Sequence, residues 1–544
     1  MLASRLSERS AASVLLIEAG EDTPPEREPA DIADTYATSY FNRKYYWPGL
    51  TAHWRQRTHS IGTAFPQARI MGGGGSVMGM VALRGTARDY DEWEHAGAAG
   101  WGWKDVLPYF RKLEHDLDCP GEFHGKAGPV TIRRLERTAW PPLSRAVEKY
   151  CLAHDIPYVA DLNADFRDGY GPLPMSNTPE RRASSASCYL DSTVRRRPNL
   201  TIATSVTVVQ IVWQGRCAVG VSTEIGGGTQ QFFAREIVIC AGAIFSPALL
   251  MRAGIGPADS LRELGIPVVA DRPGVGANLQ NHPVVFMGLH LRNAARQPVA
   301  LHTTPSIAVR YSSGLRGCSP SDLYLNIQSK TSWNPLGLQI GNVAPVLLRP
   351  LSRGSVSLRS ADPHELPRIE FNFLDDENDL ARLVGAFSRV LGILDFCRRD
   401  IPCGTPFAVR FNNRVRKLNE LNRLNRVKTA LIARAFDLAP AVADIVLTTL
   451  AGEGVPVHAL AADPARLTEH VRDNVAGLFH PAGTCRMGPE HDIQAVVDAD
   501  GRVHGVGGLR VADAAIMPNI IAGNTNIPTI MLAEKIAASI HGSR

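Results

Sequence analysis

A histidine near the carboxyl end of the chain has the chemistry to act as a general base. His480 opens the stretch HPAGTCRMG at residues 480–488. A neutral imidazole can accept a proton at cytoplasmic pH because its ordinary pKa is about 6.5. Most isolated histidines are hydrogen-bonded structural residues. The surrounding pattern must therefore decide between the two interpretations.

An acidic residue and a glycine-rich loop near the amino end are suited to holding a nucleotide. Glu18 follows the apolar run VLLI at 14–17, and a carboxylate at such a strand end can accept both hydrogen bonds of a ribose cis-diol. Four consecutive glycines at 72–75 let a ligand approach the backbone closely. Each feature alone has an ordinary alternative, namely a strand that ends in a solvated acid and a flexible surface turn. Apolar residues on both sides of the glycines favour a buried loop.

Hydrolytic and metal-dependent chemistry are disfavoured by the motifs. The sequence has no G-x-S-x-G elbow of a serine hydrolase, and Ser246 lies in the unrelated stretch FSP. No two histidines or cysteines are spaced as ligands on one element with a third nearby. We therefore expect neither a Ser-His-Asp triad nor a metal site.

Periodic patterns predict the elements that position these residues. Residues 14–17 predict a short buried strand, and the region 201–240 predicts a β-meander with glycine-containing turns. Residues 375–396 predict a helix with one apolar face. The first residues, 2–6, predict the end of an amphipathic helix.

The composition is that of a globular protein. The chain has 544 residues, of which 44% are hydrophobic and 20% charged, and this length predicts two domains. The net charge of +5 is spread along the chain, so we expect no nucleic-acid partner. The nine cysteines show no Cys-x-x-Cys spacing, and no apolar run reaches the roughly 18 residues of a membrane span. These features predict a cytoplasmic protein with no transmembrane segment.

Several ordered sequence blocks resemble the signatures of the glucose-methanol-choline (GMC) oxidoreductase family. The blocks are RIMGGG at 69–74 with DYDEW at 89–93, CAGAIFSP at 240–247, GVGANL at 274–279 with HP at 282–283, the stretch 480–488, and GLRVADA at 508–514 with GNTN at 523–526. Further stretches, at 16–24, 46–51, 124–129 and 166–170, are similar to those of family members that oxidise furanic and aromatic primary alcohols.

The resemblance implies an α/β fold with FAD as the cofactor. It implies an FAD-binding Rossmann-like domain and an α+β substrate domain with an antiparallel sheet. The discontinuous FAD-binding domain would comprise 1–150, 195–290 and 470–544, and the substrate domain 151–194 and 291–469.

The resemblance also implies roles for individual residues. His480 would be the base, and Asn524 would donate a hydrogen bond to the substrate oxygen. Glu18 would hold the adenosine ribose and Val208 would contact the adenine through its backbone. Other cofactor contacts are expected at Ala19, Trp47, Gly72, Gly74, Met78, Gly79, Met80, Val81, Phe479, Asp513, Ala514 and Thr525. Met78 replaces an asparagine that is common in relatives, and His282 is expected to be structural.

The implied reaction is the FAD-dependent oxidation of a primary alcohol to its aldehyde. The base removes the hydroxyl proton and a hydride moves to flavin N5, with oxygen or a quinone-type acceptor reoxidising the flavin. Two alternatives are a choline-dehydrogenase-like enzyme that uses a quinone-type acceptor, and a truncated or degenerate family member without activity.

The amino terminus departs from the family pattern. In relatives a helix that ends like residues 2–7 follows an apolar strand and a G-x-G-x-x-G turn, whose backbone reaches the pyrophosphate. We expect the first strand to be absent from this sequence. Between an internal methionine taken as the start and a degenerate relative, the intact block at 480–488 favours the first.

Overall fold

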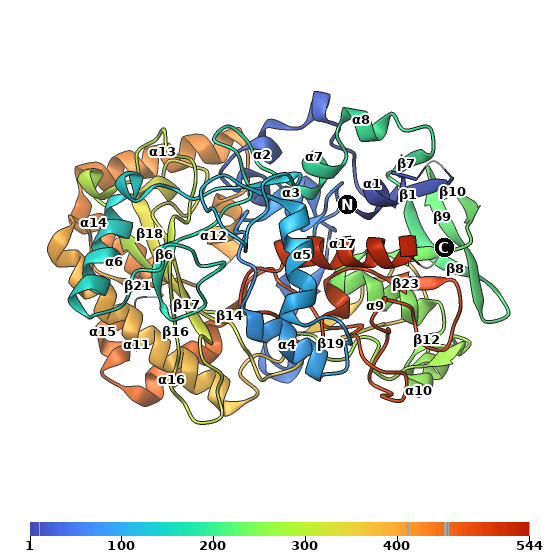
Figure 1. Cartoon of the computed structure of the whole chain (residues 1–544). Helices are drawn as coiled ribbons and strands as arrows, with labels where there is room; N and C mark the ends of the chain where they lie inside the picture. Colours follow the sequence, from blue (N-terminus) through green and yellow to red (C-terminus); the bar gives the residue numbers. More distant parts are fainter. Residues whose placement is uncertain (10, 411–412, 451–453, 455, 543–544) are drawn as a thin grey trace.

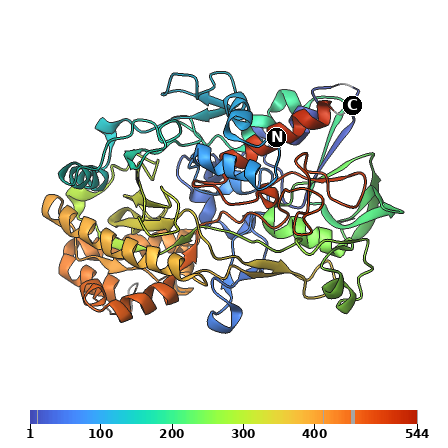
Figure 2. The same cartoon turned by 60° about the horizontal axis from the view of Figure 1, so that its bottom comes forward.

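The structure is a computed structural model that describes residues 1–544 except 10, 411–412, 451–453, 455 and 543–544. Two halves lie side by side (Figure 1). One half contains parallel strand pairs and both termini, and the other contains an antiparallel sheet covered by helices, an arrangement that Figure 2 shows from a second direction. The α/β fold class predicted from the sequence is confirmed.

Four strand pairs are parallel among the described residues, and two of them carry or closely precede predicted site residues. Strand β1 (Val14–Glu18) pairs with β7 (Leu200–Thr204), and β11 (Ile237–Ile239) pairs with β23 (Leu509–Val511). Within the described residues, no ladder joins one pair to the other. Leu15 of β1 is 38% exposed. The predicted strand at 14–17 is therefore present, but it is only partly buried.

The predicted β-meander follows β7. Strands β8 (Thr207–Gln214), β9 (Cys217–Ile225) and β10 (Gly228–Phe233) form an antiparallel sheet in the order β10-β9-β8. Gly226 and Gly227 connect β9 to β10 with φ of 55° and 86°, a left-handed conformation that glycine adopts without a Cβ clash.

A buried glutamate ties the last helix to two earlier ones. Helix α17 (Asn526–Gly542) packs against α1 (Leu2–Leu6) and α5 (Trp103–Leu113). The carboxylate of Glu534, which is fully buried in α17, forms ion pairs with Arg5 at 2.8 Å and Lys112 at 3.0 Å. A buried charge must be paired to be tolerated, so these contacts fix the position of α17 against both neighbours.

The second half is built on an eight-stranded antiparallel sheet. Its main path is β21-β15-β18-β17-β16-β6, and β14 and β22 pair beside it. The strands are β6 (Gly169–Pro172), β14 (Pro283–Val284), β15 (Met287–His290), β16 (Ile307–Tyr311), β17 (Leu323–Gln328), β18 (Ile340–Leu347), β21 (Phe407–Ala408) and β22 (Ala476–Gly477).

Helices cover this sheet on the outside of the molecule (Figure 1). Helix α11 (Glu377–Asp400) packs on β18 and on α6 (Pro142–Ala153). Its side chains Leu383 and Phe387 are completely buried, as the apolar periodicity predicted. Four more helices lie in the same half: α13 (Arg423–Leu438), α14 (Pro440–Leu450), α15 (Val457–Ala461) and α16 (Pro464–Asn474).

The short pairing of β14 with β22 brings two distant histidines together. Pro283 lies opposite Gly477 and Val284 opposite Ala476 in this antiparallel ladder. His282 immediately precedes β14 and His480 follows β22, so the ladder places both at the same end. The fold thereby joins segments that lie almost 200 positions apart in sequence.

Candidate active site

His480 lies between an asparagine and a second histidine. Its Nε2 is 3.1 Å from Nδ2 of Asn524, and its Nδ1 is 2.9 Å from Nδ1 of His282. Asn524 lies two residues before the start of α17. The structure therefore brings the two residues predicted to be catalytic into contact, and it adds a neighbour that sequence reasoning assigned only a structural role.

The local environment keeps both histidines neutral at physiological pH. Burial lowers the pKa of His282 to about 4, although hydrogen bonding to the backbone of Ile521 and Leu348 opposes the shift. Burial, followed by the electrostatic interaction with the neighbouring His282, lowers the pKa of His480 well below its ordinary value. The His480 residue as a whole is only partly buried. It is therefore a deprotonated, reachable base.

The glycine-rich loop is shaped by backbone geometry. It leads into α3 (Gly74–Val77), and Gly72 and Gly73 have φ of 84° and 56°. A Cβ on Gly72 would lie 2.4 Å from Oγ of Ser76, whereas a Cβ on Gly73 or Gly79 would meet nothing within 4 Å. The loop thus packs tightly on one side and leaves its backbone open on the other.

A buried arginine supports this loop from beneath. Arg182 has its side chain almost fully buried, and its guanidinium donates to the carbonyl oxygens of Ile32 at 2.9 Å, Gly75 at 3.3 Å and Met78 at 2.6 Å. Burial lowers its pKa to about 10. The sequence showed no signal for this residue, because Arg182 stands in an ordinary basic and serine-rich stretch more than 100 positions from the loop.

The loop ends beside the histidine pair. Met80 and Val81, both predicted to contact the cofactor, are buried in an apolar cluster with Leu478 and Ala522, which precede His480 and Asn524 by two residues each. Met80 has φ of 62° and its carbonyl accepts from the backbone N–H of Ser176 at 2.8 Å. The predicted loop residues and the catalytic pair therefore meet around one apolar cluster.

A second predicted group gathers around Glu18. Glu18 Oε1 accepts from the N–H of Gly20 at 2.7 Å, and burial raises the pKa of its carboxyl, opposed by that bond and by Arg69. Arg69 donates to the carbonyl of Ala19 at 3.1 Å and lies over the ring of Trp47 at 4.7 Å. One arginine thus connects the predicted residues Glu18, Ala19 and Trp47.

The turn after β7 places Val208 near this group. The backbone N–H of Ser205 donates to Gly20 O at 2.9 Å, and that of Val206 donates to Glu18 O at 3.1 Å. Val208 follows two residues later at a β-bulge of β8, with its side chain half-buried. This arrangement suits a backbone contact beside the Glu18 carboxylate.

Asp513 organises the start of helix α9 (Gly242–Arg252). Its Oδ2 accepts from the hydroxyl of Ser246 at 2.5 Å and from the N–H of Gly242 at 2.8 Å. Burial raises the pKa of this carboxyl, and the three bonds it accepts oppose the shift. The neighbouring carbonyl of Ala514 accepts from Gly483 N at 3.1 Å, which links Asp513 to the His480 segment. Thr525, also predicted, is buried next to Asn524.

Aromatic rings adjoin the base. The ring of Phe479 lies 5.3 Å from that of Tyr40 and 6.0 Å from that of Phe65, measured between centroids. Tyr40 also contacts Tyr46 at 6.5 Å. We call these four residues the aromatic cluster; its member Phe479 directly precedes His480 in the chain.

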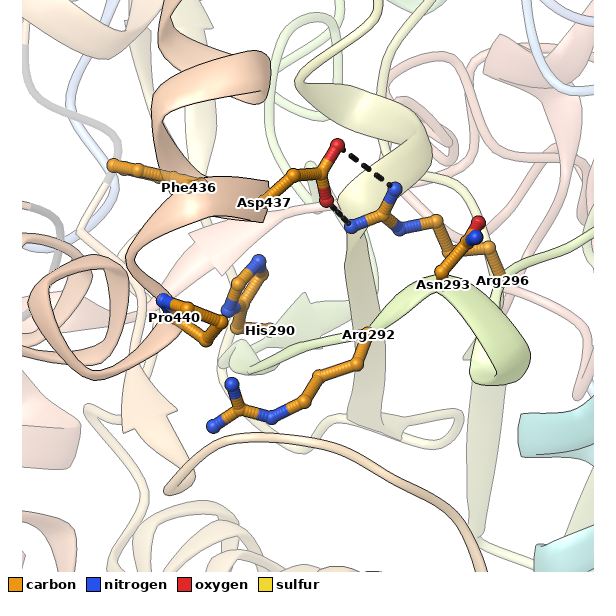
Figure 3. A pocket seen from close by; sticks show the side chains of 7 residues that line it. All are labelled: His290, Arg292, Asn293, Arg296, Phe436, Asp437 and Pro440. Carbon is orange, nitrogen blue, oxygen red and sulfur yellow. Dashed lines mark hydrogen bonds and ion pairs between the residues drawn. The ribbon is translucent and has the colours of Figure 1, made fainter.

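A separate cavity of about 340 Å³ lies in the antiparallel half (Figure 3). Its lining includes His290, Arg292, Arg296 and Asp437, and none of its residues belongs to the His480 site. Arg296 pairs with Asp437, and Arg292 lies 3.3 Å from Asp444. Because both arginines already have acidic partners, this cavity has no spare positive charge for a nucleotide phosphate.

One group of possible metal ligands, Asp116, Cys119 and His124, occurs among the described residues. Arg134 contacts Asp116 at 2.9 Å, and His124 contacts Asp161 at 2.6 Å. These acids raise the pKa of His124 to about 10, so its ring carries a proton. The group is a buried ion-pair network, since its carboxylates are already neutralised.

Parallel strands, an open glycine loop and a neutral histidine beside an asparagine fit the class of oxidoreductases that act on alcohols with a nucleotide cofactor. Comparison with known proteins agrees: profiles of the GMC oxidoreductase family match residues 50–284 and 350–533. The chain belongs to the GMC oxidoreductase family.

Similar proteins extend over the whole chain. A 5-(hydroxymethyl)furfural oxidase of Methylovorus sp. (strain MP688) is 39% identical over 99% of this chain and 96% of its own length. An oxygen-dependent choline dehydrogenase of Pseudomonas aeruginosa (strain LESB58) is 34% identical over 100% and 92%. The crystal structure of pyridoxine 4-oxidase from "Mesorbium loti" superimposes with a TM-score of 0.77 at 26% identity, over 99% and 96%.

These findings establish the reaction class. The protein is an FAD-dependent alcohol oxidoreductase, as predicted from the sequence blocks. No described helix is long and apolar enough to cross a membrane.

The residues present fit FAD. The backbone positions of Gly73 and Gly79 are open to a close ligand, and Glu18 supplies a buried carboxylate at the end of β1. Asn524 Oδ1 is buried without a hydrogen-bond partner in the protein, so one polar atom at the site awaits a ligand group. The carbonyl oxygen of Met78 accepts a hydrogen bond from Arg182. Since the backbone makes this contact, it does not depend on the Met78 side chain, which stands where relatives commonly carry asparagine.

Proposed function

We propose that this enzyme oxidises a furanic or aromatic primary alcohol to its aldehyde, with His480 as the base and oxygen as the electron acceptor. The observation that supports it most directly is the aromatic cluster beside a neutral histidine. A flat, uncharged ring can stack on such a surface while its hydroxymethyl group reaches the base.

His480 takes the hydroxyl proton in this proposal. A base whose pKa is held low by burial is deprotonated throughout the physiological range, so every molecule is ready to accept a proton. Asn524, 3.1 Å from His480 Nε2, orients the same oxygen by donating a hydrogen bond to it. FAD, when bound, supplies the hydride acceptor.

We assign the cofactor contacts to two groups of residues, one around Glu18 and one around the glycine-rich loop. Glu18 would accept hydrogen bonds from the adenosine ribose, with Ala19, Trp47 and Val208 around it. The open glycine loop and Asp513 would hold the remainder of the cofactor. The loop and neighbouring residues assigned to FAD are Gly72, Gly74, Met78, Gly79, Met80, Val81, Phe479, Ala514 and Thr525.

Choline is the second candidate substrate because of the similarity to choline dehydrogenase. A quaternary ammonium ion favours a nearby carboxylate or an aromatic cage. The aromatic cluster could also receive such an ion, so we prefer a neutral alcohol because the identity to the furfural oxidase is higher, 39% against 34%.

We propose oxygen as the acceptor because the furfural relative is an oxidase and the choline relative is described as oxygen-dependent. A quinone-type acceptor is the alternative. We also place the enzyme in the cytoplasm, since all nine cysteines are unpaired in the structure.

Anaerobic reduction of the bound flavin by a panel of alcohols tests the proposal. We expect hydroxymethylfurfural and benzyl alcohol to reduce the flavin at least about tenfold faster than choline, and admission of air to reoxidise it rapidly. Faster reduction by choline would contradict the substrate class. Reoxidation by a quinone but not by air would contradict the acceptor.

Tyr40→Leu provides a matched control for the aromatic cluster, because Tyr40 belongs to the cluster and is not assigned to FAD. We expect kcat/KM for benzyl alcohol to fall about tenfold, the scale of one lost aromatic contact, and kcat/KM for a short aliphatic alcohol to stay nearly constant. An equal loss for both substrates would show that Tyr40 supports the fold rather than substrate selection.

A further inference from the structure

Two histidine rings at the site share one hydrogen bond. Nδ1 of His282 and Nδ1 of His480 lie 2.9 Å apart, with the rings at 82° and their centroids 5.1 Å apart. A hydrogen bond between two nitrogens needs one hydrogen, so only one of these atoms is protonated. Which one it is decides where His480 carries its lone pair.

A backbone carbonyl oxygen beside the other ring nitrogen of His282 shows which of the two Nδ1 atoms is protonated. Nε2 of His282 lies 3.1 Å from the carbonyl oxygen of Ile521, which can only accept. His282 must therefore carry its hydrogen on Nε2. In a neutral ring Nδ1 is then a lone pair, and it accepts the hydrogen on Nδ1 of His480.

The same reasoning assigns the other ring nitrogen of His480, which faces Asn524. Since His480 is protonated at Nδ1, its Nε2 is a lone pair, and it accepts from the amide Nδ2 of Asn524 at 3.1 Å. The chain of hydrogen bonds that runs from Ile521 through His282 and His480 to Asn524 thus has one consistent assignment of hydrogens. Burial and lowered pKa values support the premise that both rings are neutral.

We propose that His282 is a positioning residue that holds His480 in the Nδ1–H tautomer, so that the Nε2 lone pair faces Asn524 and the substrate oxygen. This inference rests on the proposed role of His480 as the base. His282 itself touches neither substrate nor flavin in this proposal.

The backbone holds His282 and His480 in fixed relative positions. His282 is completely buried next to the β14–β22 ladder, and its carbonyl accepts from Leu478 N at 3.0 Å. Asn281 Oδ1 accepts from the backbone N–H of His282 at 2.9 Å and from that of His480 at 3.1 Å. One amide oxygen thus links the two segments, and the rings have little freedom to separate.

Two substitutions separate the acceptor function from the packing function. His282→Asn keeps an acceptor, because Oδ1 of asparagine can take the place of Nδ1 of histidine. His282→Leu has a similar volume but no acceptor, so the hydrogen on Nδ1 of His480 would lose its partner and the other tautomer would be favoured. Both variants are purified with FAD bound.

We expect His282→Leu to lower the rate of flavin reduction about a hundredfold, with KM changed less than about threefold, because a misplaced lone pair removes base catalysis but not binding. His282→Asn should recover most of the rate. A purely structural role would instead affect both variants alike, or change KM and cofactor retention together with kcat.

Nitrogen NMR of ring-labelled histidine reports the tautomer without any turnover. In the unmutated holoenzyme we expect Nε2 of His480 to show the shift of a non-protonated nitrogen, with the signal identified by its absence in His480→Ala. A protonated Nε2, or undiminished reduction by His282→Leu, would overturn the inference. Undiminished reduction by His480→Ala would instead overturn the base assignment, so the two failures are distinguishable.

Discussion

Nη1 of Arg182 donates a hydrogen bond to the carbonyl oxygen of Met78 at 2.6 Å. The same side chain reaches Gly75 and Ile32, so one buried guanidinium ties the open glycine loop to the segment around residue 32. No described carboxylate forms an ion pair with it, and the cost of burying its charge appears as the lowered pKa. A positive charge held beneath a loop assigned to the cofactor favours an anionic ligand there.

Arg182→Met should lose both stability and flavin. Removing the guanidinium leaves buried carbonyl oxygens without donors, so we expect a decrease of about 2–4 kcal/mol in the free energy of unfolding. We also expect FAD to dissociate during purification. Arg196→Met is the matched control: it changes an exposed arginine about a dozen residues along the chain, so its effect should stay below about 1 kcal/mol. Equal flavin content and melting temperature in the two variants would contradict this role of Arg182.

His480→Ala should lower the rate of flavin reduction by at least about a hundredfold, the scale of a positioned base, in a folded and flavin-loaded protein. His491→Ala, which changes an exposed histidine a few residues along the chain, should leave the rate unchanged. Stopped-flow reduction by benzyl alcohol measures both. A reduction rate in His480→Ala equal to that of the unmutated enzyme would exclude it as the base.

Asn524→Ala should have a milder effect, about tenfold on the reduction rate, because it removes orientation while the base remains. The partnerless Asn524 Oδ1 predicts that the loss of this side chain costs little stability. A larger effect than that of His480→Ala would reverse the assigned roles of the two residues.

The rate should be insensitive to pH across the neutral range. Because the pKa of His480 lies well below 6.5, kcat/KM should stay on its plateau from pH 8 to below pH 6.5 and fall only when the base becomes protonated. A fall centred near pH 6.5 or above would show that the base is not held in a pKa-lowering environment.

The free energy of unfolding should decrease at acidic pH because of His282. Its folded pKa of about 4 is lower than the unfolded value of about 6.5, so the unfolded chain binds the proton first. The contribution is fully present above pH 6.5 and is lost as the pH falls towards 4, by about 3 kcal/mol. Denaturant unfolding of unmutated protein and His282→Asn at pH 7 and pH 5 measures this difference, and the variant should show the smaller loss.

Glu18→Gln should weaken FAD binding about tenfold, since a neutral amide accepts less strongly from a ribose diol than a carboxylate does. Glu21→Gln is the control, an exposed change three residues along the chain. Titration of apoprotein with FAD gives both affinities, and equal affinities would remove Glu18 from the proposed ribose contact.

The sequence by itself determined the family, the cofactor and the elements that carry the motifs. Short blocks were sufficient because each depends on local chemistry: Gly72 and Gly73 need positive φ, strand β1 needs an apolar run, and α11 needs one apolar face. His480 and Asn524 could be named in advance because both lie inside such blocks.

The tertiary structure alone decided how those residues act. Whether His480 carries its lone pair on Nδ1 or Nε2 depends on His282 and on the carbonyl of Ile521, which approach it only through the β14–β22 ladder and the loop before α17. Arg182 gains its role under the glycine loop in the same way. Contacts between distant segments leave no periodic pattern in one sequence, and hydrogen positions depend on the complete set of partners around a buried group.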